Sequence, residues 1–509
     1  MKPMEMTLAT LPACHKLTFN TVAHEQNKAG ETGFTTDVSS NAPPADAQSG
    51  ANLKAIYAAL VILPIAAFVW IALSGKSLPA AVGVAAPTSS AVLASQAVFR
   101  LPIFLAQIAI IIAVARLFGI LLKRVGQPQV IGEMVAGLAL GPSLLGSLWP
   151  EGYAWLFPTG TVRFLNALSQ LGIVLFMFLV GLELDLKNLR ARGRHILVIS
   201  HAGMALPMLG GGLLALLLYH NYSTANTSFM EFTLFFGCAM SVTAFPVLAR
   251  ILAERGLSTT TLGSTAMACA AIADITAWAL LALSVSVERG TGNTSAILWR
   301  MVIGGTVFLV AMFFGVRRLL EFYWRRKEQT KPSSLGHNEF SFVLLIVLLS
   351  ALATELLNAH AIFGAFVAGV IMPRDGKLRA ALESRLEDIL VVLLLPLFFA
   401  YTGLRTNVGL ISSGGEWGIA ALILGVAVLG KLGGTTIAAR TTGIQWREAG
   451  GLGVLMNSRG LMELVILTIG LQDGIITPAL FTMMVIMAVV TTMMTSPILA
   501  WLVPSSRPA

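Results

Sequence analysis

The sequence predicts an all-helical protein that crosses a lipid bilayer many times. Its 509 residues are 56% hydrophobic and only 12% charged, whereas soluble globular domains carry about 25% charged residues. Apolar stretches of about 20 residues recur from residue 53 to the C-terminal end, and each is long enough to cross the hydrocarbon core as a helix. The segments of alternating polarity that build outer-membrane barrels are absent from the sequence. A surface that faces lipid therefore explains the missing charge.

The chain begins with a segment of a different kind. Residues 1–52 are polar and rich in Ala, Thr, Ser, Asn and Pro, so we expect a disordered tail. Residues 53–73 form a first hydrophobic helix, and a linker of small residues continues to residue 98. Residues 99–503 hold the main membrane domain, and residues 504–509 form a short cytoplasmic tail.

The membrane domain is predicted to contain thirteen helices. Their apolar segments lie near 99–122, 128–147, 163–183, 195–219, 229–251, 262–287, 298–319, 339–357, 360–373, 386–404, 416–439, 449–470 and 478–502. The longest basic loop, 320–338, follows the seventh segment, so six segments precede the linking helix and six follow it. This division is what an inverted-repeat transporter shows.

The basic residues test this topology independently. Counted from the segment at 99, the loops expected inside, together with the C-terminal tail, hold 21 Lys and Arg, whereas the loops expected outside hold six. This asymmetry follows the positive-inside rule and places both termini in the cytoplasm. It also explains the net charge of +9 without a nucleic-acid partner.

A charge deep in an apolar segment costs roughly 2.5–3.5 kcal/mol on insertion scales, and two of the residues that carry one stand out. Asp274 stands among small residues in AMACAAIADITAWALLAL. It either binds a cation or a proton, or caps a break in a neighbouring helix. Lys431 is flanked by glycines in AVLGKLGGTTIAAR. The alternative for Lys431 is a side chain that extends to the interface, although Arg440 marks the cytoplasmic end of this segment nine residues later.

Two further segments look interrupted. SVTAFP, at 241–246, places a proline and two hydroxyls in mid-membrane, and NSRG, at 457–460, places polar residues and a glycine there. Proline removes a backbone donor, so such sites expose backbone dipoles. The breaks fall in the fifth and twelfth segments, which are equivalent positions of two inverted halves, and this symmetry predicts a transport site. Arg459 and Glu463 are four residues apart, so their side chains meet and either fix the helix or handle ions.

Six stretches carry a family resemblance: GQPQVIGEMVAGLALGPSLLG (126–146), FLVGLELDLKNLR (178–190), SVTAFPVLARILAERGL (241–257), AAIADITAWALLAL (270–283), HAIFGAFVAGVIMPRD (360–375) and NSRGLMELVILTIG (457–470). They resemble the monovalent cation:proton antiporter-2 family. This family includes Kef-type potassium/proton antiporters, bacterial sodium/proton exchangers and plant cation/proton exchangers. The likeness spans about 99–503 and leaves out the first helix and its tail.

The resemblance implies an inverted-repeat antiporter fold of thirteen helices. A core domain and a dimerisation domain would form a homodimer that works by an elevator movement, with the fifth and twelfth helices crossing at their unwound centres. Asp274 matches the essential ion-binding aspartate, and Lys431 matches the basic residue of the eleventh helix. We expect Lys431 to be the charge partner of Asp274. The remaining site residues that we expect belong to the unwound stretches and their charges: Ser241, Thr243, Phe245, Pro246, Asn457, Ser458, Arg459 and Glu463.

One position departs from the family pattern. The family usually has Asp, Asn or Gln before the essential aspartate, and this chain has Ala273. Because one titratable acid is left at that place, we expect one proton to exchange for one cation.

The function we expect is exchange of Na⁺ or K⁺ against protons, in a bacterial inner membrane and without a cofactor. Asp274 would bind the ion together with Ser241 and Thr243. A cation channel is one alternative, although selectivity filters use rings of carbonyls or charges. Symport of an organic solute on the same fold is another, because fold alone does not set the substrate. An enzyme is not expected, since the sequence has no HExxH, no GxSxG and no clustered metal ligands.

Overall fold

The computed structural model describes residues 49–75, 100–183, 193–225, 227–257, 260–288, 303–330, 335–357, 361–373 and 376–503. Most of the predicted tail, nearly all of the linker after the first helix and residues 504–509 lie outside the described residues. Residues Gly50–Ala509 belong to one compact unit. Within the described residues, one isolated bridge between Ser223 and Ile476 is the only β-structure, so the all-helical prediction is confirmed.

The N-terminal helix begins at Ser49, inside the stretch predicted to be a tail. It consists of α1 (Ser49–Tyr57), a π-helical turn η1 (Ala58–Ile62) and α2 (Leu63–Ser74). The π-helical turn ends two residues before Pro64, which has no N–H for the carbonyl four residues earlier. A wider turn at this place accommodates the missing donor.

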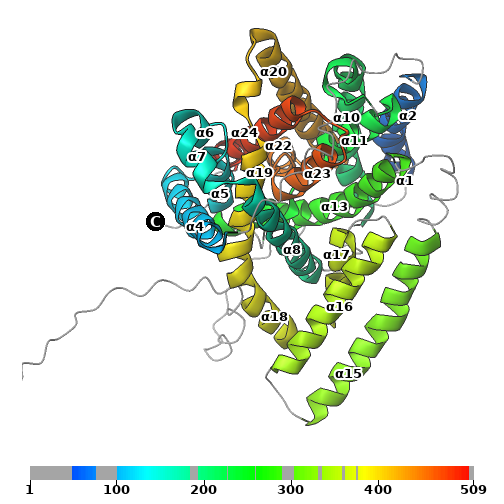
Figure 1. Cartoon of the computed structure of the whole chain (residues 1–509). Coiled ribbons are helices and arrows are strands. Elements are labelled where there is room, and N and C mark those ends of the chain that lie inside the picture. Colours follow the sequence, from blue (N-terminus) through cyan, green and yellow to red (C-terminus); the bar gives the residue numbers. More distant parts are fainter. Residues whose placement is uncertain are drawn as a thin grey trace, which may run out of the picture. The chain divides into compact units, whose positions relative to one another are not determined.

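Each of the thirteen predicted segments contains helix in the described part of the chain (Figure 1). The first half contains α4 (Leu101–Arg124), α5 (Gln129–Leu140), α6 (Leu145–Leu148), α7 (Pro150–Leu156), α8 (Thr159–Glu183), α10 (Gly193–Tyr222), α11 (Phe229–Ser241), α12 (Phe245–Glu254) and α13 (Thr261–Glu288). The linking helix and the second half contain η3 (Ala311–Val316), α15 (Arg317–Thr330), α16 (His337–Leu356), α17 (Ala361–Ile371), α18 (Gly376–Ile389), η4 (Leu390–Leu394), α19 (Leu395–Arg405), η5 (Val408–Leu410), α20 (Gly414–Val428), η6 (Leu429–Gly433), α21 (Gly434–Thr441), α22 (Trp446–Met456), α23 (Leu461–Gln472) and α24 (Pro478–Leu502).

Two predicted boundaries are wrong because helices continue beyond the apolar segments. The basic stretch 320–338 was expected to be a loop, but α15 runs on to Thr330. Likewise α18 begins at Gly376, ten residues before the expected start of its segment. Both extensions are rich in Arg, Glu, Lys or Leu, which favour helix. In each an Arg–Glu pair four residues apart adds support, with N–O distances of 2.9 Å in α15 and 2.6 Å in α18.

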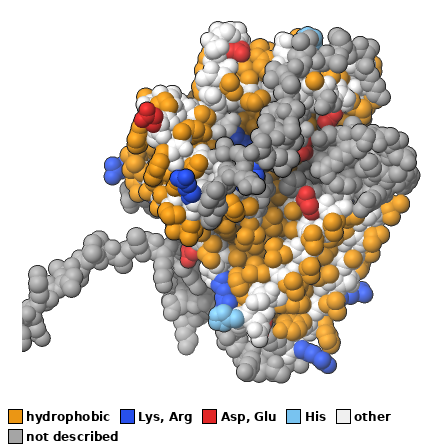
Figure 2. Space-filling model, in the orientation of Figure 1, with side chains coloured by type: hydrophobic (Ala, Val, Ile, Leu, Met, Phe, Trp, Pro, Cys, Tyr) orange, Lys and Arg blue, Asp and Glu red, His pale blue; other side chains and the backbone are white. Residues whose placement is uncertain are grey.

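The protein is an integral membrane protein. Among the described residues, ten helical stretches are long and apolar enough to cross a membrane by length and composition, and three apolar helices are shorter. Large apolar side chains stand exposed on the outside of these helices, including Leu217, Leu319 and Phe314. Figure 2 shows hydrophobic side chains over most of the described surface on one face. Lipid, and not water, suits such a surface.

The helices pack as two groups. The first bundle contains α4, α5, α8 and α16 to α19, in which α8 packs on α17 and α5 packs on α4 and α19. The second bundle contains α10 to α13 and α20 to α24, in which α10 packs on α11, α13 and α21. The N-terminal helix packs on α10 and α11 of the second bundle (Figure 1). Contact between the bundles includes α24 against α5.

Candidate functional site

The two predicted helix breaks lie against each other in the second bundle. α11 ends at Ser241 and α12 begins at Phe245, while α22 ends at Met456 and α23 begins at Leu461. The backbone N–H of Ala244 donates to the carbonyl oxygen of Ser458 at 3.1 Å. The Thr243 hydroxyl donates to the carbonyl of Met456 at 3.4 Å. Hydrogen bonds between the two breaks therefore join the fifth and twelfth helices at their interruptions.

Pro246 starts the second half of its helix and does not interrupt the first. It is the second residue of α12. At this position a helix N–H has no intrahelical acceptor, so the missing donor costs nothing. The break itself comes at Val242, whose backbone is extended with φ −68° and ψ 146°.

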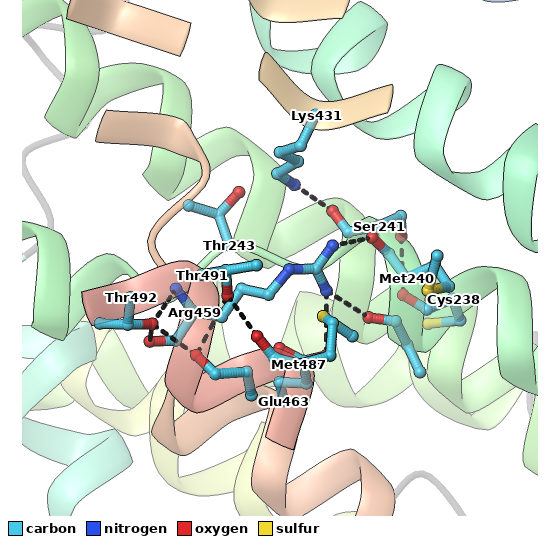
Figure 3. A network of polar contacts seen from close by, with 12 residues as sticks. Cys238, Met240, Ser241, Thr243, Lys431, Arg459, Glu463, Met487, Thr491 and Thr492 are labelled. Carbon is cyan, nitrogen blue, oxygen red and sulfur yellow. Dashed lines mark hydrogen bonds and ion pairs between the residues drawn. The ribbon is translucent and has the colours of Figure 1, made fainter. Parts of the chain in front are cut away.

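The end of α11 is a buried helix terminus whose last four carbonyl groups all have donors. The Ser241 hydroxyl donates to the Cys238 carbonyl at 2.8 Å. The Arg459 guanidinium donates to the carbonyls of Ala239 at 3.2 Å and Met240 at 2.6 Å. The Lys431 ammonium donates to the carbonyl of Ser241 (Figure 3). Two cations thus cap a helix C-terminus, where the helix dipole favours positive charge.

Arg459 is held from several sides. Its guanidinium forms an ion pair with Glu463 at 2.9 Å, and both side chains are 0% exposed. Its backbone N–H donates to the Thr492 hydroxyl at 2.9 Å, and that hydroxyl donates to the Arg459 carbonyl at 2.6 Å. Figure 3 shows the guanidinium between Glu463 and the end of α11. These contacts fix both the side chain and the backbone of Arg459 at the second break.

Lys431 points into the protein. It lies in the π-helical turn η6 between α20 and α21, and its side chain is 0% exposed. Because its ammonium group donates to Ser241, the alternative of a side chain that extends to the interface is wrong. Single π-helical turns of this kind are frequent at functional sites.

Asp274 differs from every group described so far. Its side chain is 2% exposed on α13, and among the described residues neither of its carboxylate oxygens has a hydrogen-bond donor. A direct ion pair with Lys431 is not formed in the described part of the chain, since the lysine hydrogen-bonds to Ser241 instead.

The other expected site residues supply oxygen atoms or packing. Ser241 and Thr243 are fully buried, and each gives its proton to a backbone carbonyl, which leaves the oxygen lone pairs of both hydroxyls available. The Asn457 side-chain oxygen is buried without a donor among the described residues, whereas the Ser458 hydroxyl donates to Leu455 at 2.8 Å. Phe245 is buried in the apolar core.

Sequence reasoning missed Thr492. This residue lies on α24, beside a second buried threonine, Thr491. Its hydroxyl bridges the N–H and carbonyl of Arg459 and so fixes the backbone of the second break. The adjacent threonines in an apolar helix were the available signal.

Known proteins match this chain along nearly the whole membrane domain. Residues 108–503 match the family model described as "Sodium/hydrogen exchanger, transmembrane". The chain is 42% identical over 404 residues to the Na⁺/H⁺ antiporter NhaS4 of Synechocystis sp., an alignment that covers 79% of this chain and 98% of that protein. It is 37% identical over 414 residues to the K⁺/H⁺ antiporter 1 of Saccharomyces cerevisiae, covering 80% of this chain. The chain spans about half the length of this yeast relative, namely 47%.

The fold also has a solved counterpart. The structure of the sodium proton antiporter MjNhaP1 from Methanocaldococcus jannaschii superposes with a TM-score of 0.52 over 79% of this chain and 96% of that chain. At 13% sequence identity this likeness shows the fold alone. The match along 108–503 and the identity to NhaS4 together establish that the chain belongs to the sodium/hydrogen exchanger family.

Proposed function

We propose that the protein exchanges a monovalent cation, Na⁺ or K⁺, for protons across a membrane, and that Asp274 carries both. The observation that supports this most is the buried carboxylate without a hydrogen-bond donor in the described part of the chain. An unpaired charge inside a protein is costly unless something neutralises it. A proton or a monovalent cation does so equally well in charge, and only one of them fits at a time.

Oxygen atoms at the two breaks suit this role. The hydroxyl oxygens of Ser241 and Thr243 and the side-chain oxygen of Asn457 are buried near the two breaks. Oxygen atoms are the ligands that such hard cations prefer. Lys431 and Arg459 stay bound to the end of α11, so their charges set the local field while the proton and the cation alternate on Asp274.

The division into two bundles supports a mechanism of alternating exposure. The site lies wholly in the second bundle, so a movement of that bundle against the first would expose Asp274 first to one side of the membrane and then to the other. We propose that the first bundle forms the interface of a homodimer, that both termini are cytoplasmic, and that the host membrane is a bacterial inner membrane.

The experiment is ion exchange in inside-out vesicles that hold an acid interior reported by a quenched amine dye. Adding Na⁺, K⁺, Li⁺ or Rb⁺ in turn should restore fluorescence as protons leave, and the rank order gives the selectivity. The same vesicles should show no cation current when the pH gradient is absent. Cation uptake that carries current and moves no protons would identify a channel and overturn the proposal.

A further inference from the structure

The N-terminal helix packs against α10 and α11 of the second bundle at two glycines. The Phe68 side chain is 1% exposed and fills the space beside two glycines, Gly212 of α10 and Gly237 of α11. A Cβ atom at these glycines would lie 2.7 Å and 2.5 Å from the Phe68 ring. On the opposite face of the same helix, the side chains of Leu63 and Trp70 are 68% and 70% exposed. One face therefore packs into protein and the other faces lipid.

A polar chain connects this helix to the helix that carries the carboxylate. The Tyr57 hydroxyl lies 3.0 Å from Nδ1 of His201 on α10. Nε2 of the same ring lies 3.4 Å from the hydroxyl of Thr276 on α13. Thr276 is two residues after Asp274 in the sequence, and its hydroxyl donates to the Ile272 carbonyl at 2.9 Å.

The donors and acceptors of these three hydrogen bonds fit one arrangement of protons. Since the Thr276 hydroxyl donates to Ile272, it accepts from His201, and the imidazole must therefore carry its proton on Nε2. Nδ1 is then an acceptor, which leaves the Tyr57 hydroxyl as the donor. In this arrangement every donor from Tyr57 to Ile272 has an acceptor. The Tyr57 hydroxyl therefore fixes the tautomer of His201, and in that tautomer His201 donates a hydrogen bond to Thr276 on α13.

We propose that the N-terminal helix is a working part of the ion-carrying unit, which moves with the second bundle and positions Asp274 through Tyr57, His201 and Thr276. This inference rests on the proposed function, because it needs a second bundle that moves. It assigns a role to a segment outside the matched family region, which begins at residue 108. His201 acts as a positioning residue, since it reaches the turn beside Asp274 and not the ion.

Cross-linking tests whether the helix moves with the second bundle. Paired cysteines replace Phe68 and Gly212 in a protein whose own three cysteines are changed to alanine. The matched control pair replaces Met134 of α5 and Val489 of α24, which line one small cavity between the bundles. After oxidation, the 68–212 link should leave exchange within about twofold of the reduced protein, and the 134–489 link should stop it.

The outcomes separate the two proposals. A 68–212 link that stops exchange, with a 134–489 link that also stops it, overturns the inference and leaves the proposed function intact. A 134–489 link that leaves exchange intact shows that the bundles do not move against each other. That result removes the alternating movement of the proposed function, and the inference with it.

Substitutions test the positioning role. Tyr57→Phe should raise the KM for the cation about two- to tenfold, the factor that one hydrogen bond of ordinary strength corresponds to, with a smaller change in kcat. His201→Leu should do the same, and His201→Gln should recover part of the affinity because its amide keeps a donor near Thr276. The control is Tyr219→Phe, which removes a buried hydroxyl bonded at 2.8 Å to Thr227 elsewhere in the same bundle. Equal KM changes in Tyr57→Phe and Tyr219→Phe, or no recovery by His201→Gln, would contradict the positioning role.

Discussion

The carboxylates of Glu463 and Asp274 are both buried in the second bundle, yet their surroundings are opposite. Glu463 accepts from Arg459 at 2.9 Å, and the same guanidinium holds the carbonyls of Ala239 and Met240. Asp274 has no donor at either oxygen within the described residues.

This difference separates structure from transport. In a buried ion pair such as Arg459–Glu463, each charge offsets part of the desolvation cost of the other. A buried carboxylate without a donor keeps its desolvation cost until a proton or cation arrives. If the proposed function holds, one set of charges closes the exposed backbone at the break, and a separate charge, that of Asp274, carries the ion.

The largest effect on exchange is expected from Asp274→Asn. An amide neither titrates nor balances a cation, so exchange should fall to the level of empty vesicles. The melting temperature in detergent should change little, since the carboxylate has no donor to lose in the described structure. Both quantities are measured on the same purified protein. Dequenching at the wild-type rate by a well-folded Asp274→Asn protein would remove Asp274 from the mechanism.

The largest effect on stability is expected from Arg459→Leu. The substitution strands Glu463 and two backbone carbonyls in the core. Removing one partner of a buried pair costs about 3–5 kcal/mol, so the melting temperature should fall steeply. Arg379→Leu is the matched control, because it breaks an Arg–Glu pair of the same spacing whose side chains are 40% and 28% exposed. In Arg379→Leu the free energy of unfolding should fall by only about 0–1 kcal/mol. Similar losses in the two variants would show that the α11 end does not depend on Arg459.

The sequence predicted the features that stand out against an apolar background. Asp274 is one acid among alanines, and the two breaks are indicated by Pro246 and by the polar run at 457–460. The capping of α11 was beyond reach, because a backbone carbonyl freed by a break leaves no mark in the sequence. For that reason Lys431 was expected to pair with Asp274, whereas it binds the carbonyl of Ser241.

Contacts between distant helices were equally hidden. Tyr57 and His201 are 144 residues apart, and no periodicity in either helix predicts that they meet. The extended helix α15 was missed for a different reason. Hydropathy marks where the apolar segment ends, but the Arg, Lys and Glu residues that follow continue a helix as readily as they begin a loop.

A smaller effect is expected from Lys431→Met. The variant loses one charge-assisted hydrogen bond to the end of α11, worth about 1.5–3 kcal/mol. The melting temperature should therefore fall, but less than in Arg459→Leu, and exchange should persist at a reduced rate. Lys123→Met, at an exposed position on α4, is the control and should leave both unchanged. Wild-type stability in Lys431→Met would mean that the α11 end is capped adequately without the lysine.

The smallest expected effect is none at all, and it concerns voltage. Ala273 leaves Asp274 as the one acid at its place in α13, and Glu463 is occupied by Arg459. One proton should therefore exchange for one monovalent cation, so that no net charge crosses the membrane. A potential adds about 2.3 kcal/mol per charge per 100 mV only when net charge moves. Initial exchange rates should be equal under imposed potentials of either sign, once proton leak is clamped.

A rate that follows the voltage would show that a second group titrates, with Glu463 released from Arg459 or Lys431 giving up its proton during the cycle. The Glu463→Gln and Lys431→Met variants would then identify the group, because only the variant that lacks it would lose the voltage dependence.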